Sequence, residues 1–210
     1  MFQRKERFVM ADFGNSDQIR TALRLVGELL EAQGHGYYIV VIGGAAMNLL
    51  GLRTRATTDV DVIAQAIPDA RGVPRLRRPD QPLPGPLLAA AATVAGDLGL
   101  DPDWLNAGPA GQWETGLPPG MEGRVEWEAY GGLRVGLADR RDLVFLKLYA
   151  AADQTGSNSV HFQDLVALSP SDEELDAAAV WIRRQDAGPE FNEIVAKVIN
   201  HVRTHPGRTR

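Results

Sequence analysis

The most informative pattern of this chain lies in residues 42–62, which read IGGAAMNLLGLRTRATTDVDV. Two aspartates, Asp59 and Asp61, alternate there with valines. On a strand, both carboxylates would leave the same face, about 7 Å apart along the chain. Mg²⁺ prefers hard oxygen ligands and usually takes one or two carboxylates together with substrate phosphates. The carboxylates of Asp59 and Asp61 could therefore converge on one or two divalent ions, although polar positions on a half-exposed strand are the plainer interpretation.

A pair of glycines lies upstream of the aspartates. Residues 37–42 are aromatic and β-branched, which predicts a buried strand that ends at Gly43 and Gly44. Glycines at such a point let backbone amides approach phosphate oxygens, and a helix that starts there favours negative charge. The pattern therefore suits a phosphate group beside Gly43 and Gly44, and a simple tight turn is the alternative.

The segment between the glycines and the aspartates is basic. Arg53 and Arg55 are expected to fork onto a triphosphate, with Thr57 beside them. The alternative is a solvated basic connection without a ligand.

The composition is that of an ordinary globular protein. The chain has 210 residues, of which 44% are hydrophobic and 23% charged, enough for one domain or one domain with an appendage. The net charge of −5 argues against a surface that is basic throughout, and the absence of cysteine excludes disulfides and thiolate zinc sites. No apolar stretch approaches the length of a membrane span, and the N-terminal residues lack a secretory pattern. We therefore expect a cytoplasmic protein without a membrane partner.

Hydrophobic periodicity outlines the remaining elements. Ser16 is the predicted N-cap of the first helix, and Ser171 with Glu174 predicts a capping box. Helices are predicted over residues 17–32, 45–50, 87–98, 142–152, 172–185 and 191–202, and strands over 37–42, 57–63, 125–129 and 133–137. Residues 68–86 hold six of the 13 prolines and predict a long loop. This order predicts an α+β fold, with a mixed sheet flanked by helices over residues 1–140 and a helical C-terminal part over residues 141–210.

Together, these motifs resemble those of a known superfamily. Residues 42–62 closely resemble the opening motif of the polymerase-beta-type nucleotidyltransferases: a strand, Gly-Gly, a helix, then Asp-x-Asp on the next strand. The nearer resemblance is to bacterial AbiEii-like proteins of toxin–antitoxin systems, which carry Arg-x-Thr-x-Asp-x-Asp and later a lysine within Leu-Lys-Leu. Here the later part reads DLVFLKLYA over residues 142–150 and HFQDL over residues 161–165. The resemblance runs from about residue 38 to residue 168.

The resemblance implies an activity and site residues. It implies Mg²⁺-dependent transfer of a nucleoside monophosphate from a nucleoside triphosphate to an RNA or protein hydroxyl, as in toxins with a partner antitoxin. It makes Asp59 and Asp61 metal ligands and puts Gly43 and Gly44 beside the nucleotide phosphates. It also puts Lys147 and Asp164 in the closing part of the site. For His161, three residues before Asp164, a capping or salt-link role is favoured.

The superfamily normally adds a third carboxylate from a later strand. Glu126 and Glu128 are the candidates here, and Asp164 is a substitute. If the third ligand is missing, a catalytically inactive binding module with the same fold is the alternative function. A small-molecule enzyme resembling aminoglycoside nucleotidyltransferases is a further one, and it would use an acidic acceptor pocket that includes Glu114.

Two further groups of residues have competing interpretations. Four arginines of the proline-rich segment could bind a polyanion or simply be charged side chains exposed to solvent on a loop: Arg71, Arg75, Arg77 and Arg78. Trp104 and Trp113 could stack on a base or anchor the core. The pattern leaves the nucleotide, the acceptor and the oligomeric state open.

Overall fold

The structure is a computed structural model and describes residues 11–154, 159–185 and 188–207. Its strands are β1 (Tyr37–Ile42), β2 (Val60–Pro68), β3 (Pro74–Arg77), β4 (Leu105–Asn106), β5 (Glu126–Tyr130) and β6 (Leu133–Leu137). Its α-helices are α1 (Ser16–Ala32), α2 (Gly43–Leu49), α3 (Gly85–Leu98), α4 (Gln112–Thr115), α5 (Arg140–Asp153), α6 (Val160–Ala167), α7 (Asp172–Arg183) and α8 (Pro189–Thr204). Two 3-10 turns, η1 (Gly108–Gly111) and η2 (Met121–Arg124), complete the order.

The strands form one mixed sheet. Its order is β3-β2-β1-β6-β5, and β4 pairs with β2 off this path. β1 runs antiparallel to β2 and parallel to β6, so the first strand of the chain lies at the centre of the sheet. In the register between β1 and β2, Ile42 lies opposite Asp61. The last residue of β1 therefore stands beside the second aspartate of the motif.

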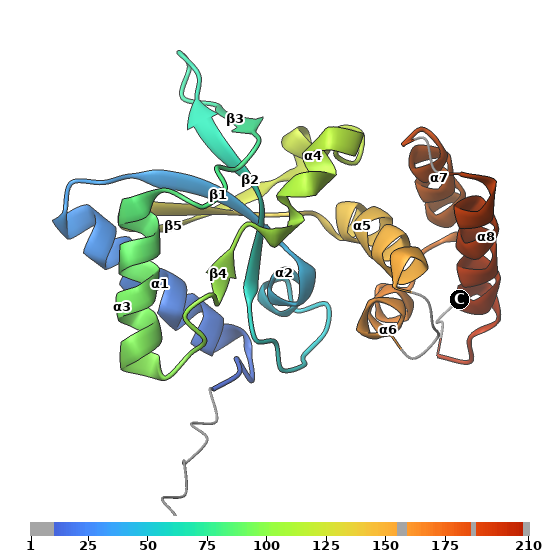
Figure 1. Cartoon of the computed structure of the whole chain (residues 1–210), viewed down its shortest axis with the longest axis horizontal. Coiled ribbons are helices and arrows are strands. Elements are labelled where there is room, and N and C mark those ends of the chain that lie inside the picture. Colours follow the sequence, from blue (N-terminus) through green and yellow to red (C-terminus); the bar gives the residue numbers. More distant parts are fainter. Residues whose placement is uncertain (1–10, 155–158, 186–187, 208–210) are drawn as a thin grey trace, which may run out of the picture.

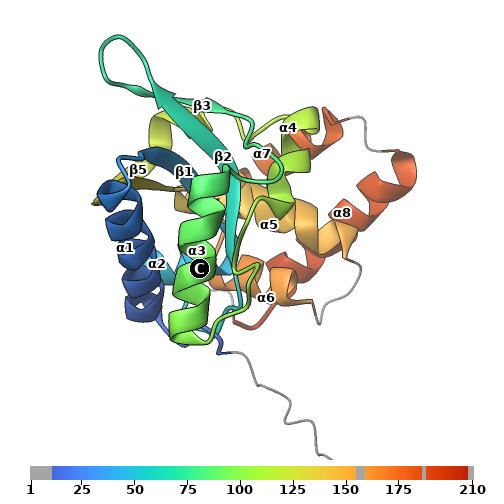
Figure 2. The same ribbon diagram turned by 60° about the vertical axis from the view of Figure 1, so that its left-hand side comes forward.

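The longer helices lie around the sheet in two groups (Figure 1). α1 and α3 lie at one end of the molecule, whereas α5 to α8 form a separate helical group at the other end. The hairpin of β2 and β3 projects away from the body in both views (Figure 2). The core is continuous from Phe13 and Trp104 to Trp181 and Val202, so the helical group shares one hydrophobic cluster with the sheet. The predicted α+β class, a mixed sheet flanked by helices, is confirmed.

Several predicted elements are matched closely. β1 and β6 begin and end at the predicted residues. The capping box of α7 is present: Ser171 Oγ accepts from the Glu174 backbone N–H, while the Glu174 carboxylate accepts from the Ser171 N–H. The predicted N-cap of α1 is wrong, because Asn15 Oδ1, not Ser16, accepts the hydrogen bond from the Gln18 N–H.

The long loop predicted over residues 68–86 is wrong in part. Residues 74–77 form β3, which pairs antiparallel with the end of β2, and α3 begins at Gly85. β3 is an edge strand that starts at a proline, where the missing N–H leaves no gap in the ladder. Across the described residues, no helix is both long and apolar enough to cross a bilayer.

Candidate functional site

The two aspartates of the motif lie where β2 begins. Asp61 is the second residue of β2, and Asp59 immediately precedes the strand. Burial, followed by the charge of Asp59, raises the pKa of Asp61 to about 6, whereas the charge of Lys147 acts in the opposite direction. No donor in the described part of the chain hydrogen-bonds the Asp61 carboxylate. A half-buried carboxylate with a like charge beside it and no donor is an environment that a cation would stabilise.

Gly43 and Gly44 lie so close to neighbouring side chains that neither position has room for a Cβ atom. Gly43 has a φ of 73°, and a Cβ there would lie 2.7 Å from Oδ2 of Asp61. A Cβ on Gly44 would lie 2.8 Å from both the Thr57 hydroxyl and the Arg55 guanidinium. The sequence thus uses glycine to bring the end of β1 and the segment before β2 into direct contact. The structure puts Gly43 against Asp61, and Gly44 against Thr57 and Arg55.

A cavity of about 510 Å³ opens beside Asp61. Gly43 and Asp61 line it from the sheet, Lys147 lines it from α5 and His161 from α6, and the chain from Gly108 to Thr115 contributes the remaining side. This volume lies within the range of about 300–1,000 Å³ typical of small-molecule sites. Asp59 is not a lining residue, so Asp61 is the member of the carboxylate pair that lines the cavity.

Asp164 is the centre of a buried cluster of charges. Its carboxylate has no solvent exposure and meets three cations. Lys147 Nζ lies 2.7 Å away, Arg53 Nη1 lies 2.6 Å away, and Arg55 donates through Nε and Nη2 at 3.0 and 2.9 Å. Burial raises the pKa of Asp164, but the Arg55 hydrogen bond and the Lys147 charge outweigh burial and lower it overall. Three cations and one carboxylate leave this cluster with a net positive charge beside the cavity.

This cluster gives Arg53 and Arg55 a different role from the expected one. Both arginines hold the Asp164 carboxylate instead of projecting freely toward a triphosphate. Arg55 also donates to the Ala56 carbonyl, so its guanidinium is fixed by local structure. Asp164 in turn has every oxygen engaged and holds Lys147 in position, which differs from the arrangement of a metal ligand.

Lys147 and His161 line the cavity together. Lys147 is only 5% exposed, and its Nζ lies 3.4 Å from His161 Nδ1. Burial lowers the pKa of His161, and the Lys147 charge lowers it further. Charge pairing with Asp164 explains how a buried ammonium is tolerated at this point of α5.

The structure does not bring Glu126 or Glu128 to the carboxylate pair. Both lie on β5, three strands away from β2, which corresponds to about 14 Å at the usual strand spacing. Glu128 is paired with Arg20 and bonded to the Tyr130 hydroxyl, and Glu126 is exposed. Among the described residues, no group of three His, Cys, Asp or Glu side chains is arranged to hold a metal ion.

Asn106 occupies the strand position next to Asp61. β4 runs parallel to β2 with Asn106 opposite Asp61, so both side chains are expected on the same face. The Asn106 amide accepts from the Gly108 N–H at 2.8 Å and donates to the Asp103 carbonyl at 3.3 Å. The neighbouring strand therefore supplies a neutral amide that is committed to its own turn.

The arginines of residues 71–78 are largely neutralised within the chain. Arg75 pairs with Asp69 and Glu122, Arg77 with Asp80, and Arg78 with Glu114. Pairing with Arg78 also takes Glu114 away from the cavity, which it does not line. This segment does not offer a continuous free basic surface.

Both tryptophans of interest are anchored by their indole N–H groups. Trp104 is fully buried, packs edge-on against Phe13 and donates to the Ala91 carbonyl. Trp113 donates to the Ile63 carbonyl at 2.6 Å. Neither residue lines the cavity, so the core-anchor interpretation fits both.

The sequence reasoning missed much of the cavity wall. Leu143, Ala150 and Gln154 line the cavity with Lys147 because they lie four residues before it and three and seven after it on one helical face. That spacing was available as a signal. The opposite wall, η1 with Gln112, follows a two-residue strand that has no recognisable pattern.

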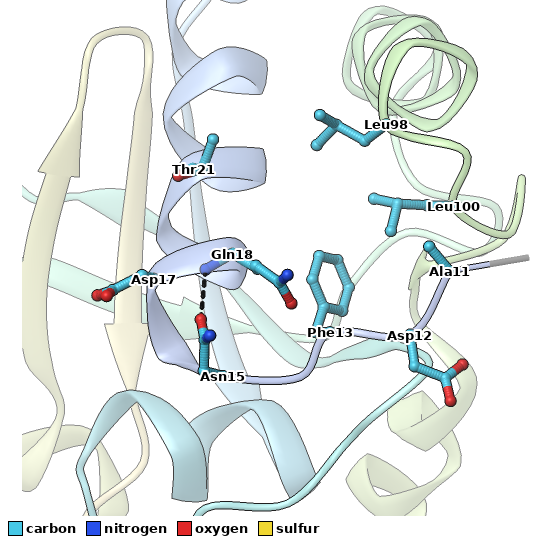
Figure 3. A pocket seen from close by; sticks show the side chains of 9 residues that line it. All are labelled: Ala11, Asp12, Phe13, Asn15, Asp17, Gln18, Thr21, Leu98 and Leu100. Carbon is cyan, nitrogen blue, oxygen red and sulfur yellow. Dashed lines mark hydrogen bonds between the residues drawn. The ribbon is translucent and has the colours of Figure 1, made fainter.

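A second hollow of about 300 Å³ lies beside the start of α1 (Figure 3). Phe13, Leu98 and Leu100 form its apolar side. Asn15 caps α1, and Gln18 accepts from the Gly14 N–H, so both amide side chains already serve the local backbone. This hollow contains no cationic side chain and is separate from the carboxylate pair.

Comparison with known proteins gives one weak likeness. Neither a protein-family model nor a curated protein sequence matches the chain. A solved structure of an antigenic nucleotidyltransferase-like protein from Paracoccidioides brasiliensis is similar over 89% of this chain and 95% of its own, with 14% identity and a TM-score of 0.43. A likeness this weak does not define a family or an activity for this chain.

Proposed function

We propose that this chain is a nucleotidyltransferase that moves a nucleoside monophosphate from a nucleoside triphosphate to a hydroxyl of an RNA or a protein. One observation carries the proposal: the Asp61 carboxylate, which has a like charge at Asp59 and no hydrogen-bond donor, lines a cavity of about 510 Å³ that the buried cation Lys147 also lines. The resemblance of the motifs to polymerase-beta-type enzymes supports the same conclusion.

The donor set fits Mg²⁺. Asp59 and Asp61 are hard oxygen ligands, and substrate phosphates and water commonly complete such a site. When bound, Mg²⁺ would lower the pKa of an attacking hydroxyl and stabilise charge on the phosphates. The raised pKa of Asp61 supports this fit, since a cation would relieve both its burial and the repulsion from Asp59.

The reaction exchanges one phosphoester bond for another. The acceptor oxygen forms a bond to the α-phosphorus, the bond from the α-phosphorus to the bridging oxygen breaks, and pyrophosphate leaves with its electron pair. The acceptor proton passes to solvent. Lys147 and the positive cluster around Asp164 would stabilise the charge of the leaving pyrophosphate.

The geometry also bears on the acceptor. A cavity of about 510 Å³ has the size of a small-molecule site, and Asp59 is not among its lining residues. An acceptor would therefore reach the carboxylate pair from the surface, as a hydroxyl of a macromolecule can. An antitoxin partner remains part of the proposal only through the motif resemblance.

The decisive experiment is a transfer assay with each α-³²P-labelled ribonucleoside triphosphate, Mg²⁺, and bacterial RNA or the protein itself as acceptor. Incorporation by the wild type, its loss in Asp59→Asn and Asp61→Asn, and its retention in Asp97→Asn would support the proposal. Asp97 is an exposed aspartate on α3 and serves as the matched control. Equal labelling by wild type and Asp61→Asn would refute it.

A binding module without turnover is the second candidate. The placement of Glu126 and Glu128 away from the pair favours it, because no third carboxylate accompanies the two aspartates in the described chain. Mg²⁺-dependent nucleotide binding by the wild type, lost in Asp61→Asn and never followed by release of pyrophosphate, would identify this case.

A further inference from the structure

The wall of the cavity holds a histidine whose two nitrogens have different surroundings. His161 Nδ1 lies 3.4 Å from the Lys147 ammonium, while no residue of the described chain hydrogen-bonds Nε2. The ring itself is half-buried and lines the cavity. Nδ1 therefore faces the interior, and Nε2 is the nitrogen left for a ligand.

The contact with Lys147 determines the protonation pattern of the ring. A lysine ammonium has three donors and no acceptor, so Nδ1 must supply the lone pair. In the neutral ring the single proton then sits on Nε2. The Lys147 ammonium lies 2.7 Å from the Asp164 carboxylate, and burial together with the Lys147 charge lowers the pKa of His161.

We infer that His161 is a nucleotide-binding residue that offers an uncharged Nε2–H donor to a phosphate oxygen of the triphosphate in this cavity. The inference rests on the proposed function and adds a ligand contact to it. A phosphate is the acceptor favoured here because Lys147 lines the cavity and, together with Arg53 and Arg55, outnumbers the single Asp164 carboxylate that they share.

Other charged groups act on the same ring. Asp164 and Arg55 influence it from the buried cluster, and Asp153 influences it from the end of α5. Asp153 also lines the cavity, yet it makes no hydrogen bond to His161. If Asp153 instead held the His161 ring in place, the imidazole would donate its N–H to the Asp153 carboxylate. A phosphate would then have to displace that hydrogen bond.

The first test reads the tautomer without any ligand. Histidine side-chain ¹⁵N spectra near neutral pH should show, for His161, an unprotonated Nδ1 and a protonated Nε2. The signal is assigned by its loss in His161→Gln, and Asp153→Asn serves as the matched control. An Nδ1–H tautomer, a charged ring, or a tautomer that changes in Asp153→Asn would overturn the inference.

The second test measures binding by calorimetry, with Mg²⁺ and two probes: ATP, and tripolyphosphate, which lacks a base. In His161→Gln the amide nitrogen takes the place of Nε2 and binding should stay within about threefold of wild type. In His161→Asn the amide takes the place of Nδ1, and both probes should bind roughly tenfold to a hundredfold more weakly, the loss expected for one hydrogen bond to a charged acceptor.

The outcomes separate the two proposals. If the wild type binds both probes and His161→Asn binds them equally well, the histidine inference fails and the proposed function stands. If His161→Asn binds only ATP more weakly and binds tripolyphosphate like the wild type, the contact is to the base or ribose, and the phosphate assignment is wrong. If the wild type binds neither probe, the proposed function fails, and the histidine inference fails with it because it rests on nucleotide binding.

Discussion

Replacing Asp61 with asparagine should make the protein more stable at neutral pH, although it removes the central residue of the site. The folded environment raises the pKa of Asp61 from the ordinary 3.8 to about 6. This difference of about 2 pKa units corresponds to about 3 kcal/mol, since each unit is worth about 1.4 kcal/mol. Folding therefore works against the ionised carboxylate, and the amide of the Asp61→Asn variant would carry no charge to bury.

The sign of the effect follows from proton binding. Between about pH 4 and pH 6 the folded chain holds a proton on Asp61 that the unfolded chain has lost, so wild-type stability falls as the pH rises. Above about pH 6 the full penalty of about 3 kcal/mol is present, and below about pH 4 it vanishes. Asp61→Asn should therefore gain most at neutral pH and almost nothing in acid.

Urea unfolding followed by circular dichroism, at about pH 4 and about pH 7.5 with chelator present, measures this difference. Asp97→Asn on the exposed face of α3 is the control and should show no such pH-dependent gain. Added Mg²⁺ should narrow the gap between wild type and Asp61→Asn, because it binds only the carboxylate form. A gain that is equal at both pH values, or a loss at neutral pH, would refute the reasoning.

Three further predictions concern the same site. Gly43→Ala should weaken Mg²⁺ binding and lower the stability of the fold more than Gly51→Ala does. Both positions have positive φ, where a side chain costs about 1–2 kcal/mol of strain. Only at Gly43 would the added Cβ also collide with Asp61. Equal losses of stability by thermal unfolding and unchanged Mg²⁺ affinity would contradict this. Asp164→Asn should lower the free energy of unfolding in urea by about 3–5 kcal/mol, because three cations lose their carboxylate partner. Asp176→Asn, which removes an exposed ion pair, should change this free energy little. Similar effects of the two substitutions would argue against a buried charge cluster around Asp164. Mg²⁺ affinity, titrated by calorimetry, should fall about tenfold per pH unit below about pH 6 as Asp61 takes up its proton, and a flat profile would exclude Asp61 as a ligand.

Local sequence was sufficient to predict the elements whose structure depends on the side chains of a single segment. Residues 37–42 are aromatic and β-branched, and they form β1 with the predicted ends. The capping box at Ser171 was predictable for the same reason, since both partners lie within four residues. β2, in contrast, extends to Pro68 through Ala64, Gln65 and Ala66, which have weak strand preference and become strand because β1 and β3 flank them.

The site shows where local patterns stop being informative. The alternation of Asp59 and Asp61 predicted a shared face, and the motif resemblance added Lys147 and Asp164. Nothing in the sequence indicated that Arg53 and Arg55 would bind Asp164, more than a hundred residues away, because such pairing depends on the packing of α6 against the segment before β2. The alternation of Glu126 and Glu128 was equally suggestive, yet the strand order places β5 at the far edge.

The charge cluster around Asp164 also limits how this chain can be divided. Arg53 and Arg55 belong to the sheet half, while Lys147 and Asp164 belong to the helical half that follows residue 140. A cut at that point would leave two arginines without their carboxylate on one fragment, and a buried lysine–aspartate pair exposed on the other. Any recombination that exchanged the helical half for another would have to bring a matching acid at the position of Asp164. The two halves therefore have to be engineered as one unit.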